Sequence, residues 1–130
     1  DLGQACAIGT QKKRIQGTPG YIAPEQAHRR RITPATDTYN FGATMHWVLC
    51  GQVIPTAIPP KGEQAGMGSG TIDTDRIAAP TPLHTINSRI PESLSNLILE
   101  CVRVPRAARP AALDIVAMNL RIIGDGLADL

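Results

Sequence analysis

Residues 35–50, "ATDTYNFGATMHWVLC", set the strongest limit on how this chain can fold. Pro34 suits the first turn of a helix and Gly51 suits its end, so we predict a helix over residues 35–50. A helix that is apolar nearly all round is usually buried on most of its sides. We therefore expect other elements to pack around this helix, with Trp47 in the core. Its apolar residues are Tyr39, Phe41, Ala43, Met45, Trp47, Val48 and Leu49.

Two further helices are predicted from apolar residues spaced three and four positions apart. The first covers residues 92–102, starts after Pro91 and carries one apolar face. The second runs from about Pro110 to Ile123, with Gly124 as its stop. The apolar faces consist of Leu94, Leu97, Ile98 and Cys101 on the first helix, and Leu113, Val116, Ala117 and Leu120 on the second.

The remaining segments carry loop signals rather than a clear periodicity. Residues 52–90 are rich in Pro, Gly and Thr. Because a structureless connection of that length is uncommon in a compact domain, we expect one or two short helices there and a mobile stretch near "AGMGSG". Residues 1–34 are predicted to be irregular, and no segment has a convincing strand pattern.

Composition limits the class of protein. A chain of 130 residues is enough for one domain, and its core must be mainly aliphatic because only 3% of residues are aromatic. A net charge of +2 does not require nucleic acid or a membrane as partner. Three well-separated cysteines without a CxxC motif favour reduced thiols in a cytoplasmic protein. No apolar run is long enough to span a bilayer.

Four motifs follow one another along the chain: "DLG" (1–3), "GTPGYIAPE" (17–25), "TDTYNFG" (36–42) and "RVPRAARP" (103–110). The series resembles the C-terminal half of a protein kinase domain, from the metal-binding triplet onward. Any one motif alone is weak evidence, whereas four in the expected order are strong evidence. The form "GTPGYIAPEQ" is similar to that of bacterial serine/threonine kinases.

The resemblance implies a mainly α fold, the C-terminal helical lobe of a protein-kinase-like domain. Residues 1–34 would form the activation segment, residues 35–123 the helical lobe and residues 124–130 a tail. The N-terminal lobe, with its glycine-rich loop and strand lysine, would precede Asp1. The catalytic loop would also precede it, so all of these motifs are absent from the 130 residues.

Asp1 matches the aspartate that holds magnesium against the ATP phosphates in kinases. ATP and Mg²⁺ are thus the cofactors implied for the intact parent enzyme, and we expect neither to bind this fragment tightly. The alternative for Asp1 is a frayed, solvated residue. Thr18 resembles the hydroxyl that contacts the catalytic aspartate and places the substrate hydroxyl, and its alternative is a simple turn threonine. The substrate platform implied by the resemblance consists of Gly17, Thr18, Pro19, Gly20 and Tyr21.

Thr10 is the only hydroxyl residue of the implied activation loop, residues 4–16, and is therefore a candidate phosphorylation site. An unmodified loop threonine is the simpler interpretation. The basic residues 12–14 that follow it are interpreted as a solvated run rather than a specific site.

Three residues are expected to have structural roles. By resemblance, Glu25 pairs with Arg109, and the alternative is two unrelated surface charges. Asp37 would accept backbone N–H groups of the catalytic loop, and the alternative is simple capping of its own helix. Gly42 costs about 1 kcal/mol relative to Ala inside a helix, so we expect a packing reason for it. Val104 replaces an acidic residue that is frequent in the family.

The function implied is that of a serine/threonine kinase fragment, which in its parent transfers the ATP γ-phosphate to a protein substrate. We expect the fragment to be inactive alone, because it lacks the N-terminal lobe of its own domain as a partner. A pseudokinase-like interaction module without catalysis is the alternative. Nucleic-acid binding is disfavoured because the basic clusters at 12–14 and 28–31 contain no aromatic residues. The histidines His28, His46 and His84 lack metal-ligand spacing, and "GMGSG" (66–70) lacks dinucleotide-fingerprint spacing.

Overall fold

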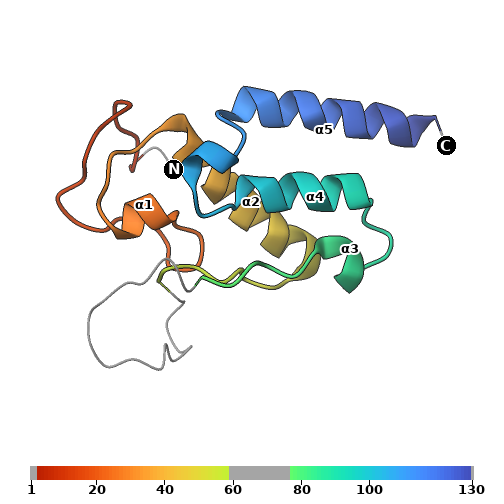
Figure 1. Ribbon diagram of the computed structural model, residues 1–130, viewed down its shortest axis with the longest axis horizontal. Helices are drawn as coiled ribbons and strands as arrows, with labels where there is room; N and C mark the ends of the chain where they lie inside the picture. The colour runs from red at the N-terminus through yellow and green to blue at the C-terminus, as the bar shows by residue number, and fades with distance from the viewer. Residues whose placement is uncertain (1–2, 59–76, 130) are drawn as a thin grey trace.

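The computed structural model describes residues 3–58 and 77–129, and these residues form a helical bundle with a long irregular N-terminal segment (Figure 1). Helices α2, α4 and α5 contact one another, and α3 packs against α2 and α4. Within the described ranges, β structure is limited to an isolated bridge between Gln11 and Arg31. The prediction of a mainly α fold is confirmed. The elements are α1 (Pro24–Ala27), α2 (Pro34–Cys50), α3 (Leu83–Ile86), α4 (Glu92–Cys101), the 3-10 helix η2 (Arg106–Ala108) and α5 (Leu113–Ala128).

The ends of α2 follow the sequence signals closely. The Thr33 amide donates a hydrogen bond to the Thr36 hydroxyl at 3.2 Å, which satisfies a donor ahead of the first turn. Pro34 occupies the first turn. At the other end Gly51 adopts the left-handed conformation, with φ of 72°, and its N–H reaches the carbonyl of Trp47. The observed helix extends the predicted range by one residue.

Helix α2 contributes to three hydrophobic clusters that together form the core. Tyr39 and Ala43 are almost fully buried and pack in a first cluster with Ala23, which precedes α2, and Ile54, which follows it. Met45 and Leu49 pack against a second cluster around α3 and α4. Phe41 packs against a third cluster between α4 and α5. The central position predicted for this helix is confirmed. The buried members of the second and third clusters are Leu83, Ile90 and Ile98, and Leu97, Cys101 and Val116.

The prediction that Trp47 lies in the core is wrong. Its side chain is 47% exposed, and the adjacent Val48 is 58% exposed. Helices α3, α4 and α5 cover other faces of α2, and the described residues leave this stripe open to solvent. The apolar sequence of this helix correctly identifies Trp47 and Val48 as apolar surface. It does not show whether another element covers them.

The two later helices agree with the sequence in different degrees. On α4, Leu97, Ile98 and Cys101 are buried as predicted, and Leu94 packs against the cluster that contains Ile98. Helix α5 does not stop at Gly124 and instead continues to Ala128. Its first predicted core residue, Leu113, is 40% exposed.

In the part of the chain that the structure describes, the segments outside the three predicted helices contain two short α-helices, and only one of them was expected. Helix α1 lies inside the segment predicted to be irregular, while α3 is one of the short helices expected between residues 52 and 90. The "AGMGSG" stretch lies outside the described residues. Cys6 is exposed, Cys50 is half-buried and Cys101 is buried, and none of the three forms a disulfide.

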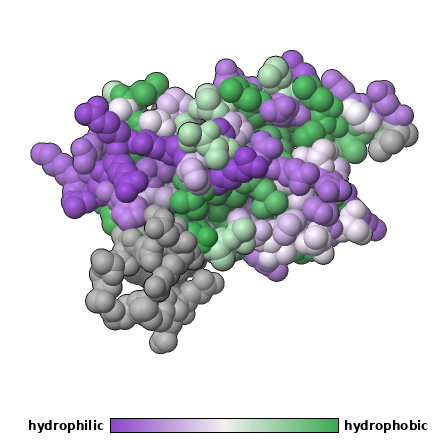
Figure 2. All heavy atoms as spheres, in the orientation of Figure 1, coloured by the Kyte–Doolittle hydropathy of each residue, from purple (hydrophilic) through white to green (hydrophobic). Residues whose placement is uncertain are grey.

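Exposed apolar side chains on α2 and α5 predict self-association of the purified chain. Trp47 and Val48 are matched on α5 by Met118 and Ile122, which are 58% and 62% exposed, and Figure 2 shows hydrophobic residues gathered over α5. Surfaces of this kind bind partners or aggregate. We expect light scattering and binding of a hydrophobic dye, both reduced in the Trp47→Gln, Val48→Gln double variant. A dye-negative monomer with a sharp thermal transition would contradict this expectation.

Candidate functional site

Glu25 and Arg109 form a buried, two-pronged ion pair. Arg109 Nη1 lies 2.7 Å from Glu25 Oε1, and Nη2 lies 3.0 Å from Oε2. Both residues are at least 95% buried, although 84 positions separate them in the sequence. The planar guanidinium group matches a carboxylate through two parallel hydrogen bonds. The structure thus brings together the two residues whose pairing the sequence predicts.

Both members of this pair have further hydrogen-bond partners. Arg109 donates three more hydrogen bonds, to the backbone carbonyls of Arg103, Ala35 and Val104, at 2.6, 3.0 and 2.9 Å. The Thr36 hydroxyl donates to Glu25 at 2.8 Å. The guanidinium group also lies 4.9 Å from the centre of the Tyr39 ring, within cation–π range. A buried charge pair stabilises a fold only with such additional partners.

The environment of Glu25 controls its protonation. Burial by itself raises the pKa of this carboxyl. The hydrogen bonds and the positive charge of Arg109 outweigh burial, with help from a backbone hydrogen bond and Thr36, and they hold the pKa below its ordinary value of 4.5. Glu25 is therefore ionised at neutral pH, as the ion pair requires.

This lowered pKa predicts acid destabilisation. Because the folded pKa of Glu25 is lower than the unfolded one, the ion pair contributes its full stability above pH 4.5. That contribution is lost as the pH falls through the folded pKa. Urea unfolding measured from neutral to acidic pH should show a decline that is shallower in Glu25→Gln. Equal acid dependence in both proteins would remove Glu25 as the cause.

Residues 17–21, the predicted platform, form an ordered turn before α1. Gly17 and Gly20 have φ of 118° and 90°, a region that side chains disfavour. The amide of Tyr21 donates to the Thr18 carbonyl, and Gly20 donates to Ile58, both at 3.1 Å. Thr18 and Pro19 are exposed and so remain accessible to a binding partner.

Asn40 connects this turn to α1 and α2, and sequence reasoning missed it. Its side-chain amide donates to the Tyr21 carbonyl at 2.9 Å and to Gln26 Oε1 at 2.7 Å. Gln26 Oε1 also accepts the Ala23 amide at 2.8 Å. The available sequence signal was an amide side chain between the apolar residues Tyr39 and Phe41 of this helix.

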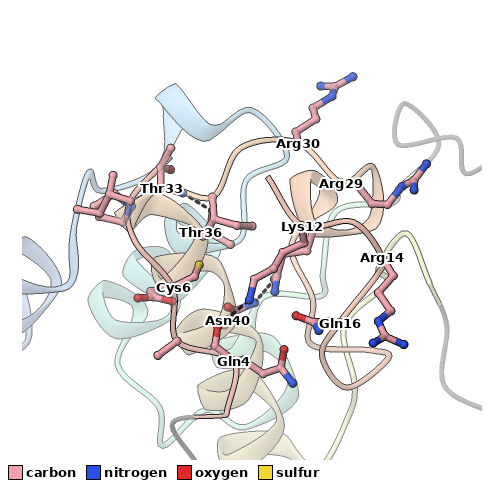
Figure 3. A pocket seen from close by; sticks show the side chains of 16 residues that line it. Gln4, Cys6, Lys12, Arg14, Gln16, Arg29, Arg30, Thr33, Thr36 and Asn40 are labelled. Carbon is pink, nitrogen blue, oxygen red and sulfur yellow. Dashed lines mark hydrogen bonds between the residues drawn. The ribbon is translucent and has the colours of Figure 1, made fainter. Parts of the chain in front are cut away.

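A cavity of about 440 Å³ opens between the N-terminal segment and the start of α2 (Figure 3). Asp37 lines it with Lys12, Gln16 and Asn40. The Asp37 carboxylate is exposed and makes no hydrogen bond with any residue in the described ranges. An acceptor is thus available at the cavity wall.

The segment before the cavity is held by backbone pairing. Gly9 donates to the Ile32 carbonyl at 2.7 Å, and Ile32 donates to Thr10 at 2.9 Å. The Thr10 hydroxyl is half-buried and donates to the Ala7 carbonyl at 2.6 Å. A phosphoryl group on Thr10 would therefore replace an existing hydrogen bond within the loop.

Asp1, the residue matched to the metal ligand, lies outside the described residues. Among residues 3–58 and 77–129, no group of three or more His, Cys, Asp or Glu side chains could hold a metal ion.

Comparison with known proteins identifies the family. The family model described as protein kinase domain matches residues 1–120, so the chain belongs to the protein kinase family. Protein substrates, with ATP and Mg²⁺ as cofactors, are general features of that family. Within the ranges described here, none of the helices is both long and apolar enough to cross a membrane.

Relatives from three kingdoms share this region. The chain is 30% identical over 91% of its length to "Serine/threonine-protein kinase PkaA" of Streptomyces coelicolor. It is 26% identical over 88% to "Putative mitogen-activated protein kinase kinase kinase 7-like" of Drosophila melanogaster. It is 31% identical over 83% to "Probable serine/threonine-protein kinase PBL26" of Arabidopsis thaliana. The chain spans only 19%, 28% and 23% of these relatives, respectively.

Proposed function

We propose that the chain is the C-terminal helical lobe of a bacterial-type serine/threonine kinase, from the activation segment onward. Its parent would transfer the ATP γ-phosphate to Ser or Thr of a protein in the cytoplasm. The observation that carries the proposal is the buried Glu25–Arg109 pair, which anchors α1 directly behind the ordered turn at residues 17–21. The resemblance to the Streptomyces kinase over most of the chain supports the bacterial assignment.

The proposed roles are those that the kinase resemblance implies, and the positions of Thr18 and Asp37 are compatible with them. Thr18 is exposed at the turn, where its hydroxyl would contact the catalytic aspartate and help to place the substrate hydroxyl. Asp37 lines the cavity and would accept backbone N–H groups of the catalytic loop. Asp1 would hold magnesium, which offsets negative charge on the transferred phosphoryl group. Phosphate on Thr10 would order the activation loop by pairing with arginine side chains.

We expect residues 1–130 alone to transfer no phosphate from ATP. Phosphoryl transfer depends on positioning by the nucleotide loop, the strand lysine and the catalytic base, and the 130 residues contain none of them. Radiolabelled ATP and a generic Ser/Thr peptide provide the assay, with a mock purification as control. Transfer above the mock level would refute the expectation.

The same assay on a chain extended upstream through the remaining kinase motifs tests the function itself. Transfer to Ser and Thr peptides, lowered at least tenfold by Thr18→Ala, is the expected result. Arg121→Gln, at an exposed position outside the substrate platform, is the control. Partner binding by an extended chain that transfers no phosphate would instead favour a pseudokinase-like interaction module.

A further inference from the structure

Two basic triplets from separate parts of the chain lie side by side. The bridge between Gln11 and Arg31 sets residues 12–14 beside residues 29–31. One Arg29 guanidinium nitrogen donates to the Lys13 carbonyl at 2.9 Å, which joins the two triplets directly. Figure 3 shows Arg14, Arg29 and Arg30 extending on the same side of the pocket.

This basic surface, residues 12–14 and 29–31, is not neutralised by the carboxylates near it. Glu25 is the only carboxylate between residues 3 and 34, and it is buried and paired with Arg109. Asp37 lines the neighbouring cavity together with Lys12, but it forms no ion pair with any residue of the surface. Within the described part of the chain, none of the six basic side chains forms an ion pair. The region has a hydrophilic surface in Figure 2. An unbalanced positive surface attracts acidic ligands.

The surface is also concave and partly organised. A hollow of about 470 Å³ is lined by Gln11, Lys12, Lys13, His28 and Arg29, without a carboxylate. Nε2 of His28 is buried and has no hydrogen-bond partner among the described residues. Arg29 directly follows the C-cap of α1 and has a φ of 52°, the left-handed conformation that commonly ends a helix.

We propose that this basic surface binds Asp or Glu side chains of the protein substrate, close to the residue that is phosphorylated. The inference rests on the proposed function, because it assigns the substrate class of the same site. Arg14 is separated by only two residues from the turn at 17–21, so one extended peptide can contact both. Basic residues without interleaved aromatics fit an acidic peptide better than single-stranded nucleic acid.

Binding of a fluorescent peptide to residues 1–130 tests this inference without requiring catalysis. The probe is a serine peptide flanked by Asp and Glu, and its Gln/Asn counterpart is the uncharged reference. The variant Lys13→Gln, Arg14→Gln removes two positive charges from the surface. The control Arg89→Gln, Arg121→Gln removes two exposed positive charges from other parts of the chain. Circular dichroism and thermal unfolding establish that both variants are folded.

The acidic peptide should bind at least tenfold more tightly than the reference, and its affinity should fall with added salt. The surface variant should lose at least tenfold in affinity while the control stays within about twofold, a difference that net charge alone cannot produce. Arg29→Asn, which tolerates positive φ, should show a similar loss. Equal affinity for both peptides, or equal losses in both double variants, would overturn the proposal. Tighter binding to phosphatidylserine vesicles or single-stranded RNA than to the acidic peptide would also overturn it.

The two experiments together distinguish a failure of the acidic-substrate inference from a failure of the proposed kinase function. An extended chain that phosphorylates acidic and uncharged peptides equally well is a kinase for which this inference fails. If an extended chain binds the acidic peptide but transfers no phosphate, the basic surface is still a site for acidic ligands, but the proposed kinase function is wrong.

Discussion

Replacing Arg109 with methionine is expected to lower the free energy of unfolding by about 3–5 kcal/mol. The substitution leaves the Glu25 carboxylate buried with only the Thr36 hydroxyl and a backbone group as hydrogen-bond partners. It also frees three backbone carbonyls that Arg109 now satisfies. Urea unfolding followed by circular dichroism measures the change. The control is Arg121→Met, on the exposed face of α5, which should change stability by less than about 0.5 kcal/mol.

A double-mutant cycle then isolates the pair itself. Glu25→Gln removes the negative charge but retains a polar side chain of similar size, and the double variant combines both changes. Because the two side chains are in direct contact, their effects should not add, and the coupling energy should be about 1–3 kcal/mol. Strictly additive losses would show that the ion pair does not stabilise the fold and would weaken the argument that it anchors α1.

Gly42→Val is expected to destabilise the chain by about 3 kcal/mol, at the upper end of overpacking effects. A Cβ atom at Gly42 would lie 2.7 Å from Cys101 Cβ and 2.8 Å from Val102 Cγ1. Neither atom is at the end of a flexible side chain, so α4 would have to move away from α2. Gly42→Ala should have a smaller cost, because a helix gains about 1 kcal/mol when Ala replaces Gly.

Gly124 provides a matched control for this prediction. It also lies within a helix, but a Cβ atom there would meet nothing within 4 Å. Gly124→Ala should therefore raise stability by up to about 1 kcal/mol through helix propensity alone. Thermal and urea unfolding of the three variants are sufficient. A Gly42→Ala protein that gains as much stability as Gly124→Ala would show that close α2–α4 packing does not require the glycine.

Local sequence patterns predicted those features that depend on neighbouring residues. The ends of α2 follow from Pro34 and Gly51, because each residue has a conformation that suits one end of a helix. The buried face of α4 follows from apolar spacing. Gly124 was misread as a stop because glycine is also tolerated within a helix, where its cost of about 1 kcal/mol is offset elsewhere.

The pairing of Glu25 with Arg109 was predictable only through ordered motifs. Spacing along the chain says nothing about a contact between residues 84 positions apart. Kinase motifs in the same order carry that information, because they identify a fold in which both positions are known to meet. The motifs did not indicate the other partners, such as Tyr39 and the Val104 carbonyl.

The order of residues was sufficient to determine the main helices, the aliphatic core and the kinase resemblance, because periodicity, helix-end residues and motifs are local properties. Only the tertiary structure decided that Trp47 is exposed, that Asn40 holds the turn before α1, and that two basic triplets share one surface. Each of these features depends on which segments pack against one another. The apolar pattern of a helix shows which of its faces are more stable when buried. The packing of the other segments determines which of those faces are covered.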